Sequence, residues 1–154
     1  METAKVLSLT LSTLSHATED RNKVLRAAEE LCPEGCSGKL ETRRVKGHHG
    51  NEIIVIQIRS ASARQAERCF EHFWSRLAVA DQGRIRSRME DSTNSGGTLF
   101  IRIDKGESYK GKILLGDSDA IRIEVRFAVH GMSGDLMLRS IENRLIAITD
   151  FNSE

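Results

Sequence analysis

The stretch AIRIEVRFAV, residues 120–129, decides the fold of this chain. Apolar side chains occupy every second position: Ile121, Ile123, Val125 and Phe127. Charged side chains stand between them: Arg122, Glu124 and Arg126. Successive side chains of a β-strand point to opposite faces, so this alternation predicts a strand with one face in a core. The charged face is then left for water or for a partner.

Four further stretches predict strands of the same sheet. Residues 98–104 alternate in the same way, with Leu99, Ile101 and Ile103 facing inward, and residues 6–14 alternate leucines with serines and threonines. Residues 40–46 and 51–59 flank a glycine-containing turn, which predicts a hairpin with a polar tip.

Apolar residues at helical spacing predict helices over residues 18–32, 62–77 and 133–148, with a weaker one over 82–89. Thr18 is the expected N-cap of the first helix, and Ser62 with Gln65 forms a capping box for the second. The segment 104–112 has room for one helical turn. The order β-α-β-β-α-(α)-β-β-α predicts an α+β fold, a mostly antiparallel sheet with helices packed on one face.

The length of 154 residues predicts a single domain over 1–154. No apolar run is long enough to cross a membrane, and the first residues lack the pattern of a signal peptide. Three cysteines without an export signal favour a reducing, cytoplasmic location. Net charge is only +1, with 23 basic and 22 acidic residues, so composition alone does not indicate a nucleic-acid binder.

Four segments in series resemble an archaeal family described as predicted RNA-binding proteins or exosome subunits. They are residues 17–27, the Lys46–Asn51 turn, Leu99–Lys105 and Asp119–Ile123. The resemblance covers about residues 5–130 and leaves the C-terminal helix and tail, 131–154, outside. It implies a fold similar to that of a large-subunit ribosomal protein that grips ribosomal RNA. It also implies RNA as a partner, with RNA-processing or exosome proteins as further partners. Residues 106–109 depart from the family pattern.

Basic side chains gather in the expected hairpin: Lys39, Arg43, Arg44, Lys46, His48 and His49. Lys and Arg on a hairpin suit phosphate contacts, because they displace condensed counterions and fix the register on a backbone. The alternative interpretation is a solvated hairpin tip. Adjacent histidines on a strand point to opposite faces, so the pair is not expected to share a metal ion.

The charged face of the late strands is the second candidate surface. Its charges are either cross-strand ion pairs or RNA contacts, and Phe100 is either a core residue or a platform for an unpaired base. A third candidate is the arginine series Arg76, Arg84, Arg86 and Arg88, which could add phosphate contacts or be solvated.

These observations favour a non-catalytic RNA-binding protein that contacts the RNA backbone and shape. The predicted contacts are Arg43, Arg44, Lys46, His48, Arg102, Lys105 and Arg122. No nucleophile elbow, phosphate-binding loop or calcium loop occurs, so neither a catalytic residue nor a metal or cofactor is expected. One alternative is a protein-interaction or scaffold domain that forms a homodimer without binding nucleic acid. A third hypothesis is an enzyme that acts on nucleic acid through scattered histidines and lysines.

Overall fold

A computed structural model describes residues 2–32, 38–47 and 49–152. Five strands form one sheet in the order β2-β3-β1-β5-β4, and every neighbouring pair is antiparallel. The strands are β1 (Val6–Ser15), β2 (Lys39–Lys46), β3 (Glu52–Arg59), β4 (Thr98–Asp104) and β5 (Ala120–Phe127). The predicted antiparallel sheet is therefore confirmed.

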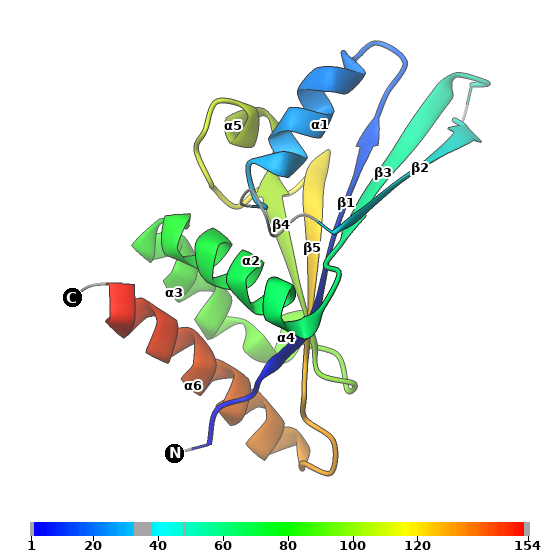
Figure 1. The fold of residues 1–154 in the computed structure, drawn as a ribbon. Coiled ribbons are helices and arrows are strands. Elements are labelled where there is room, and N and C mark those ends of the chain that lie inside the picture. The colour runs from blue at the N-terminus through cyan, green and yellow to red at the C-terminus, as the bar shows by residue number, and fades with distance from the viewer. Residues whose placement is uncertain (1, 33–37, 48, 153–154) are drawn as a thin grey trace.

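The helices lie on one side of this sheet (Figure 1). They are α1 (Arg21–Glu29), α2 (Ala63–Arg76), α3 (Val79–Ser87), α4 (Met89–Ser92), α5 (Lys105–Tyr109) and α6 (Gly134–Asn152). α2, α3 and α6 cover the lower part of the sheet, and α1 and α5 pack together near its upper end (Figure 1). The α+β class with helices on one face is confirmed, and the other face of the sheet carries no helix in the described part of the chain.

The core lies between the sheet and α2. Phe70, Phe73 and Trp74 of α2 are at most 1% exposed, and the rings of Phe70 and Phe127 meet edge to face with centroids 5.8 Å apart. The inward residues of β4 and β5 are buried as predicted: Leu99, Ile101, Ile103, Ile121, Ile123, Val125 and Phe127. Fully burying a large apolar side chain contributes about 1.5–3 kcal/mol, so this layer holds the helices on the sheet. None of the helices described is long and apolar enough to cross a membrane.

Two predicted helix boundaries are wrong. α1 begins after Asp20 and not after Thr18, because the Asp20 carboxylate accepts a hydrogen bond from the Asn22 amide at 2.9 Å and caps the helix. The weak helix expected over 82–89 is two elements, α3 and α4, since the backbone at Arg88 leaves the helical conformation. The single helical turn allowed within 104–112 is α5.

The first strand also differs from the simple alternation. A register irregularity between Val6 and Ser8 places Val6 and Leu9 in the core and leaves Leu7 40% exposed. A β-bulge of this kind shifts every preceding side chain to the other face.

The β2–β3 hairpin lies at one edge of the sheet, to the side of the helices (Figure 1). Every residue of β2 is exposed, whereas Ile56 and Ile58 of β3 are buried. β2 is thus attached to the sheet chiefly through its hydrogen-bonded pairing with β3. Of the cysteines, Cys69 is buried in the core and Cys32 is half-buried, while Cys36 lies outside the described residues.

Candidate functional site

The helix-free side of the sheet, called the open face below, can be assigned from the strand register. Residues that pair directly across antiparallel strands share a face. Among the described strand residues, six basic side chains fall on the open face: Lys39, Arg43, Arg59, Arg102, Arg122 and Arg126. Three acidic ones accompany them: Glu41, Asp104 and Glu124. The open face is therefore basic although the whole chain is nearly neutral.

Arg102 and Arg122 stand directly opposite each other on β4 and β5. Like charges in this position destabilise a sheet, so their neighbours matter. The Arg122 Nε lies 3.2 Å from the Glu124 carboxylate, and its guanidinium lies 4.9 Å from the centroid of the Phe100 ring. Arg102 donates through Nη1 to the carbonyl oxygen of Asp117 at 3.3 Å. Among the described residues, a carboxylate thus balances only one of the two guanidinium charges.

A second basic pair, Lys39 and Arg59, stands opposite on β2 and β3. Lys39 lies 3.4 Å from Glu41, and Arg59 is in no ion pair with a described residue. Arg43 and Arg126 are likewise outside the ion pairs that join the described residues. Several guanidinium groups of the open face are therefore available to an anionic ligand.

The structure divides the basic hairpin between two sides. Arg43 pairs with Val55 and lies on the open face. Arg44 pairs with Ile54 and Lys46 pairs with Glu52 in the strand register, so both lie on the helix side of the sheet. There the Arg44 Nε also lies 3.5 Å from the Glu52 carboxylate. His48 lies outside the described residues. The predicted hairpin contacts therefore do not form one surface.

Lys105 is buried, with 6% of its surface exposed, although its residue type and motif predicted an RNA contact. Its ammonium donates to the Leu14 carbonyl oxygen at 2.9 Å, to Glu19 at 3.0 Å and to Asp119 at 2.9 Å. These three acceptors match the three hydrogens of an ammonium group. In this conformation the Lys105 ammonium is bonded to acceptors within the protein and is not available to an RNA phosphate.

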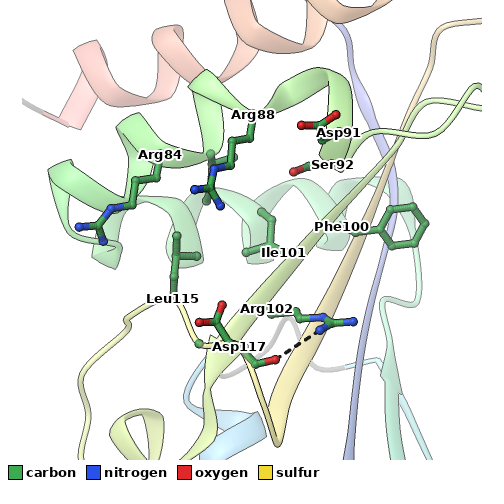
Figure 2. Close-up of a pocket in the computed structure, with 11 residues that line it drawn as sticks. Arg84, Arg88, Asp91, Ser92, Phe100, Ile101, Arg102, Leu115 and Asp117 are labelled. Atoms are coloured by element: carbon green, nitrogen blue, oxygen red, sulfur yellow. Dashed lines mark hydrogen bonds between the residues drawn. The ribbon is translucent and has the colours of Figure 1, made fainter.

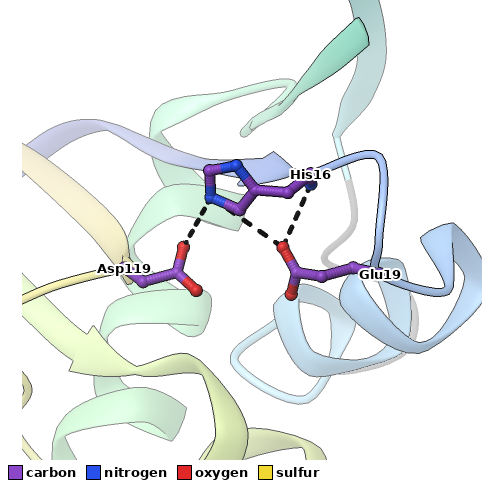
Figure 3. A group of neighbouring side chains, drawn as sticks. All are labelled: His16, Glu19 and Asp119. Carbon is purple, nitrogen blue, oxygen red and sulfur yellow. Dashed lines mark hydrogen bonds and ion pairs between the residues drawn. The ribbon is translucent and has the colours of Figure 1, made fainter. Parts of the chain in front are cut away.

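The partners of Lys105 form a small polar cluster with His16 (Figure 3). His16 Nε2 lies 3.2 Å from the Asp119 carboxylate, and one ligand atom from each of His16, Glu19 and Asp119 lies within 4.8 Å of the others. Such a trio could hold a metal ion, but here the Lys105 ammonium bonds to both carboxylates. Burial raises the pKa of Asp119, yet the hydrogen bond and charge of Lys105, with a smaller contribution from His16, outweigh it and lower that pKa.

A groove of about 500 Å³ lies on the outer side of β4, the last strand of the sheet (Figure 2). Side chains from α3, α4, β4 and the segment 115–117 line it, among them Arg84, Arg88, Asp91, Arg102 and Asp117. Arg84 is paired with Asp81 at 2.6 Å, whereas Arg88 is exposed and takes part in no ion pair with the residues described.

The other arginines of that series do not reach the groove. Arg76 lies 2.7 Å from Glu30 and donates to the Gly111 carbonyl oxygen, and Arg86 lies 3.7 Å from Glu142. Arg59 belonged to no candidate surface in the sequence, whereas Arg126 and Arg88 belonged to the second and third candidate surfaces without being among the seven residues predicted to contact RNA. The alternation of side chains along the strands could have placed Arg59 and Arg126 on the open face. No sequence signal identified the groove that Arg88 lines.

Together the fold and the site define an α+β domain whose uncovered antiparallel sheet face is basic and borders a polar groove. The chain belongs to the family whose model is described as RNA binding, which matches residues 8–127. The match ends before α6.

Two archaeal relatives illustrate the family. The chain is 28% identical over 142 residues to the RNA-binding protein PAB1135 of Pyrococcus abyssi, covering 90% of this chain and 92% of the relative. It is 29% identical over 123 residues to the uncharacterized protein MJ0213 of Methanocaldococcus jannaschii, covering 74% and 78% of the two chains.

Solved structures share the fold. Protein AF2318 from Archaeglobus fulgidus, of the DUF54 family, superimposes with a TM-score of 0.77 at 23% identity, covering 94% of this chain and 99% of that one. A DUF54 protein from Methanothermobacter thermautotrophicus gives a TM-score of 0.73 at 24% identity, covering 92% and 99%. The helices and sheet described above are therefore the common fold of these proteins.

Proposed function

We propose that this protein binds RNA through the open face of its sheet and that it does so without catalysing a reaction. The observation that carries the proposal is the unbalanced basic row on that face, centred on the directly opposed Arg102 and Arg122. A polyanion relieves the repulsion between two such groups, and a phosphate backbone supplies that charge at regular spacing. The family description and the name of the Pyrococcus relative support RNA as the polyanion.

Two kinds of contact follow from the side chains on this face. Arg43, Arg59 and Arg126 contact phosphates, because no carboxylate among the described residues neutralises them. Phe100, partly exposed beside Arg122, offers a ring on which an unpaired base stacks. Phosphate contacts fix the position of the RNA, and stacking favours a single-stranded segment.

The proposal includes association with RNA-processing proteins in the cytoplasm, which rests on the family resemblance alone. Co-purification of the tagged protein from its own source, before and after ribonuclease treatment, tests it. Partners such as exosome subunits that remain after the treatment support direct association; an empty ribonuclease-resistant fraction refutes it.

A homodimer through the edge strand β2 is the competing idea. Leu40 is 48% exposed and Val45 37% exposed, so β2 does present apolar surface. Lys39, Arg43, Arg44 and Lys46 lie on the same strand, however, and edge-to-edge pairing of two copies would bring these charges together. The charge pattern of β2 therefore favours RNA over a second copy of the chain.

Fluorescence anisotropy with a labelled single-stranded RNA tests RNA binding directly. We expect affinity to fall steeply between about 50 and 200 mM salt, since bound phosphates release counterions. Arg102→Gln and Arg122→Gln should each weaken binding and reduce the salt slope by about 0.7, the value for one contact to a single strand. Arg64→Gln and Arg68→Gln, two exposed arginines of α2 on the other side of the sheet, are the matched controls. Salt-independent binding, or equal losses in both pairs, would refute the proposal.

A further inference from the structure

The groove beside β4 differs in chemistry from the open face. It combines arginines with two carboxylates, those of Asp91 and Asp117, which are in no ion pair within the described part of the chain. Ser92 adds a hydroxyl, and Ile85, Ile101 and Leu115 supply an apolar floor. A surface that only follows a phosphate backbone gains nothing from free carboxylates, because they repel phosphates. The carboxylates indicate a ligand that carries hydrogen-bond donors as well as negative charge.

The groove is connected with the open face around the edge of β4. β4 is the last strand of the sheet. Near the two ends of its outer edge, Leu99 and Ile103 form isolated β-bridges with Thr93 and Leu115, respectively. The stretch between them contains Phe100 and Arg102, which border both surfaces. A polymer that lies on the open face can therefore continue over this short stretch into the groove.

The positions of the charged groups suit the parts of one nucleotide. Figure 2 shows Arg88 extending from the helical wall of the groove, with Asp117 across from it and Asp91 at the α4 end. The Arg102 guanidinium lies on the Phe100 side of β4 (Figure 2), where it donates to the carbonyl oxygen of Asp117 at 3.3 Å and keeps its remaining N–H groups for a ligand. The volume of about 500 Å³ is that of a small-molecule site and too small for a duplex.

We propose that the groove takes one unpaired ribonucleotide of the bound RNA. Its phosphate binds Arg88, the adjoining phosphate meets Arg102 on the open-face side of β4, and its ribose 2′-hydroxyl donates to a carboxylate of the Asp91 and Asp117 pair. Because the 2′-hydroxyl is the group that distinguishes RNA from DNA, these carboxylates make the protein prefer RNA. This inference rests on the proposed RNA-binding function and specifies the class of RNA: single-stranded, with a free ribose edge.

The test compares the affinities of a labelled single-stranded RNA and a DNA of the same base order for the full chain. Wild-type protein should prefer RNA. The double variant Asp91→Ala/Asp117→Ala should reduce the ratio of RNA to DNA affinity about tenfold, since the bond of one 2′-hydroxyl to a charged acceptor is worth about 1.5 kcal/mol. Removing negative charge strengthens binding of any polyanion, but it does so for both probes, so the ratio of affinities isolates the ribose contact. Arg88→Gln should weaken both probes and leave the ratio unchanged.

Glu90→Ala is the matched control. Glu90 is an exposed carboxylate next to Asp91, and it does not line the groove. Its removal should raise both affinities and leave the ratio at the wild-type value. An equal change of the ratio in Glu90→Ala and in the double variant would overturn the inference, because it would show a general charge effect.

Three further outcomes separate this inference from the proposed function. If wild type binds RNA and DNA equally, or prefers a duplex RNA to the single strand, the groove does not hold a ribonucleotide although RNA binding stands. If the ratio stays unchanged in the double variant while Arg122→Gln still weakens binding, the ribose contact is excluded and the open face is retained. If no nucleic acid binds to the folded wild type, both ideas are refuted together.

Discussion

Replacing Lys105 by methionine should destabilise the protein without removing its affinity for RNA. Methionine keeps an unbranched apolar stem and removes only the ammonium group. That group donates hydrogen bonds to Leu14, Glu19 and Asp119 at 2.9–3.0 Å, and Lys105 as a residue is 6% exposed. The substitution therefore leaves two carboxylates side by side without their shared counterion.

The size of the effect follows from the exposure of the three side chains. Removing one partner of a fully buried ion pair costs about 3–5 kcal/mol. Here the Glu19 side chain is 27% exposed and that of Asp119 is 50% exposed, so water screens both carboxylates. We therefore expect the free energy of unfolding to fall by about 2 kcal/mol, between the buried and the exposed limits.

Urea unfolding followed by tryptophan fluorescence measures this quantity, because Trp74 is the single tryptophan and is fully buried. Lys110→Met is the control: Lys110 is 68% exposed at its side chain and lies 3.8 Å from Glu107, so its removal should cost less than about 0.5 kcal/mol. Neutralising both carboxylates as well, with Glu19→Gln and Asp119→Asn, should recover part of the loss. If Lys105→Met unfolds at the wild-type urea concentration, or loses RNA affinity while fully folded, Lys105 is not the internal ion-pair partner described here.

Three other changes test local features of the fold. The pKa of Asp119 is lowered in the folded state. Its contribution to stability is therefore complete above the unfolded pKa of about 3.9 and is lost as the pH falls through the folded pKa. Asp119→Asn should flatten the dependence of stability on pH in that acid range, and an unchanged dependence contradicts this. Burial, aided by the charge of Arg76, lowers the pKa of His72, so stability should decline as the pH falls below about 6.5, and His72→Gln should remove that part of the decline in urea titrations at several pH values. Ser62→Ala should lower the free energy of unfolding by about 1 kcal/mol, because the Ser62 hydroxyl accepts from the Gln65 amide at 3.2 Å and caps α2; a loss below about 0.3 kcal/mol would argue against the cap.

The sheet was predictable because its strands are regular. β4 and β5 alternate without interruption over Thr98–Asp104 and Ala120–Phe127, and that pattern alone assigns their inward and outward faces. The helix side was predictable from the apolar stripe of α2, whose Phe73 and Trp74 fill the core. The irregular position was Leu7, where a bulge reverses the faces in a way that residue types do not indicate.

The candidate site was harder to predict because it depends on distant pairing. A dense run of charge suggested that Arg43 and Arg44 act together, but neighbouring residues of a strand face opposite sides. The role of Lys105 depends on Leu14 and Glu19, which are 91 and 86 positions away in the chain, so no local pattern could reveal its burial. For the same reason no local pattern indicated that Arg88 and Asp117 line one groove.

The exposure of β2 has a consequence for hydrogen exchange. Because no side chain of β2 is buried, opening this strand uncovers little apolar surface, and its local free energy of opening depends mainly on the ladder hydrogen bonds to β3. Backbone amides of β2 should therefore exchange with deuterium far faster than those of β1, which is paired on both sides. Arg43 and Lys39 belong to this loosely held strand and also to the open face. A ligand that engages them must restrict the hairpin, so slowed exchange in β2 would be an early and sensitive signal of its arrival.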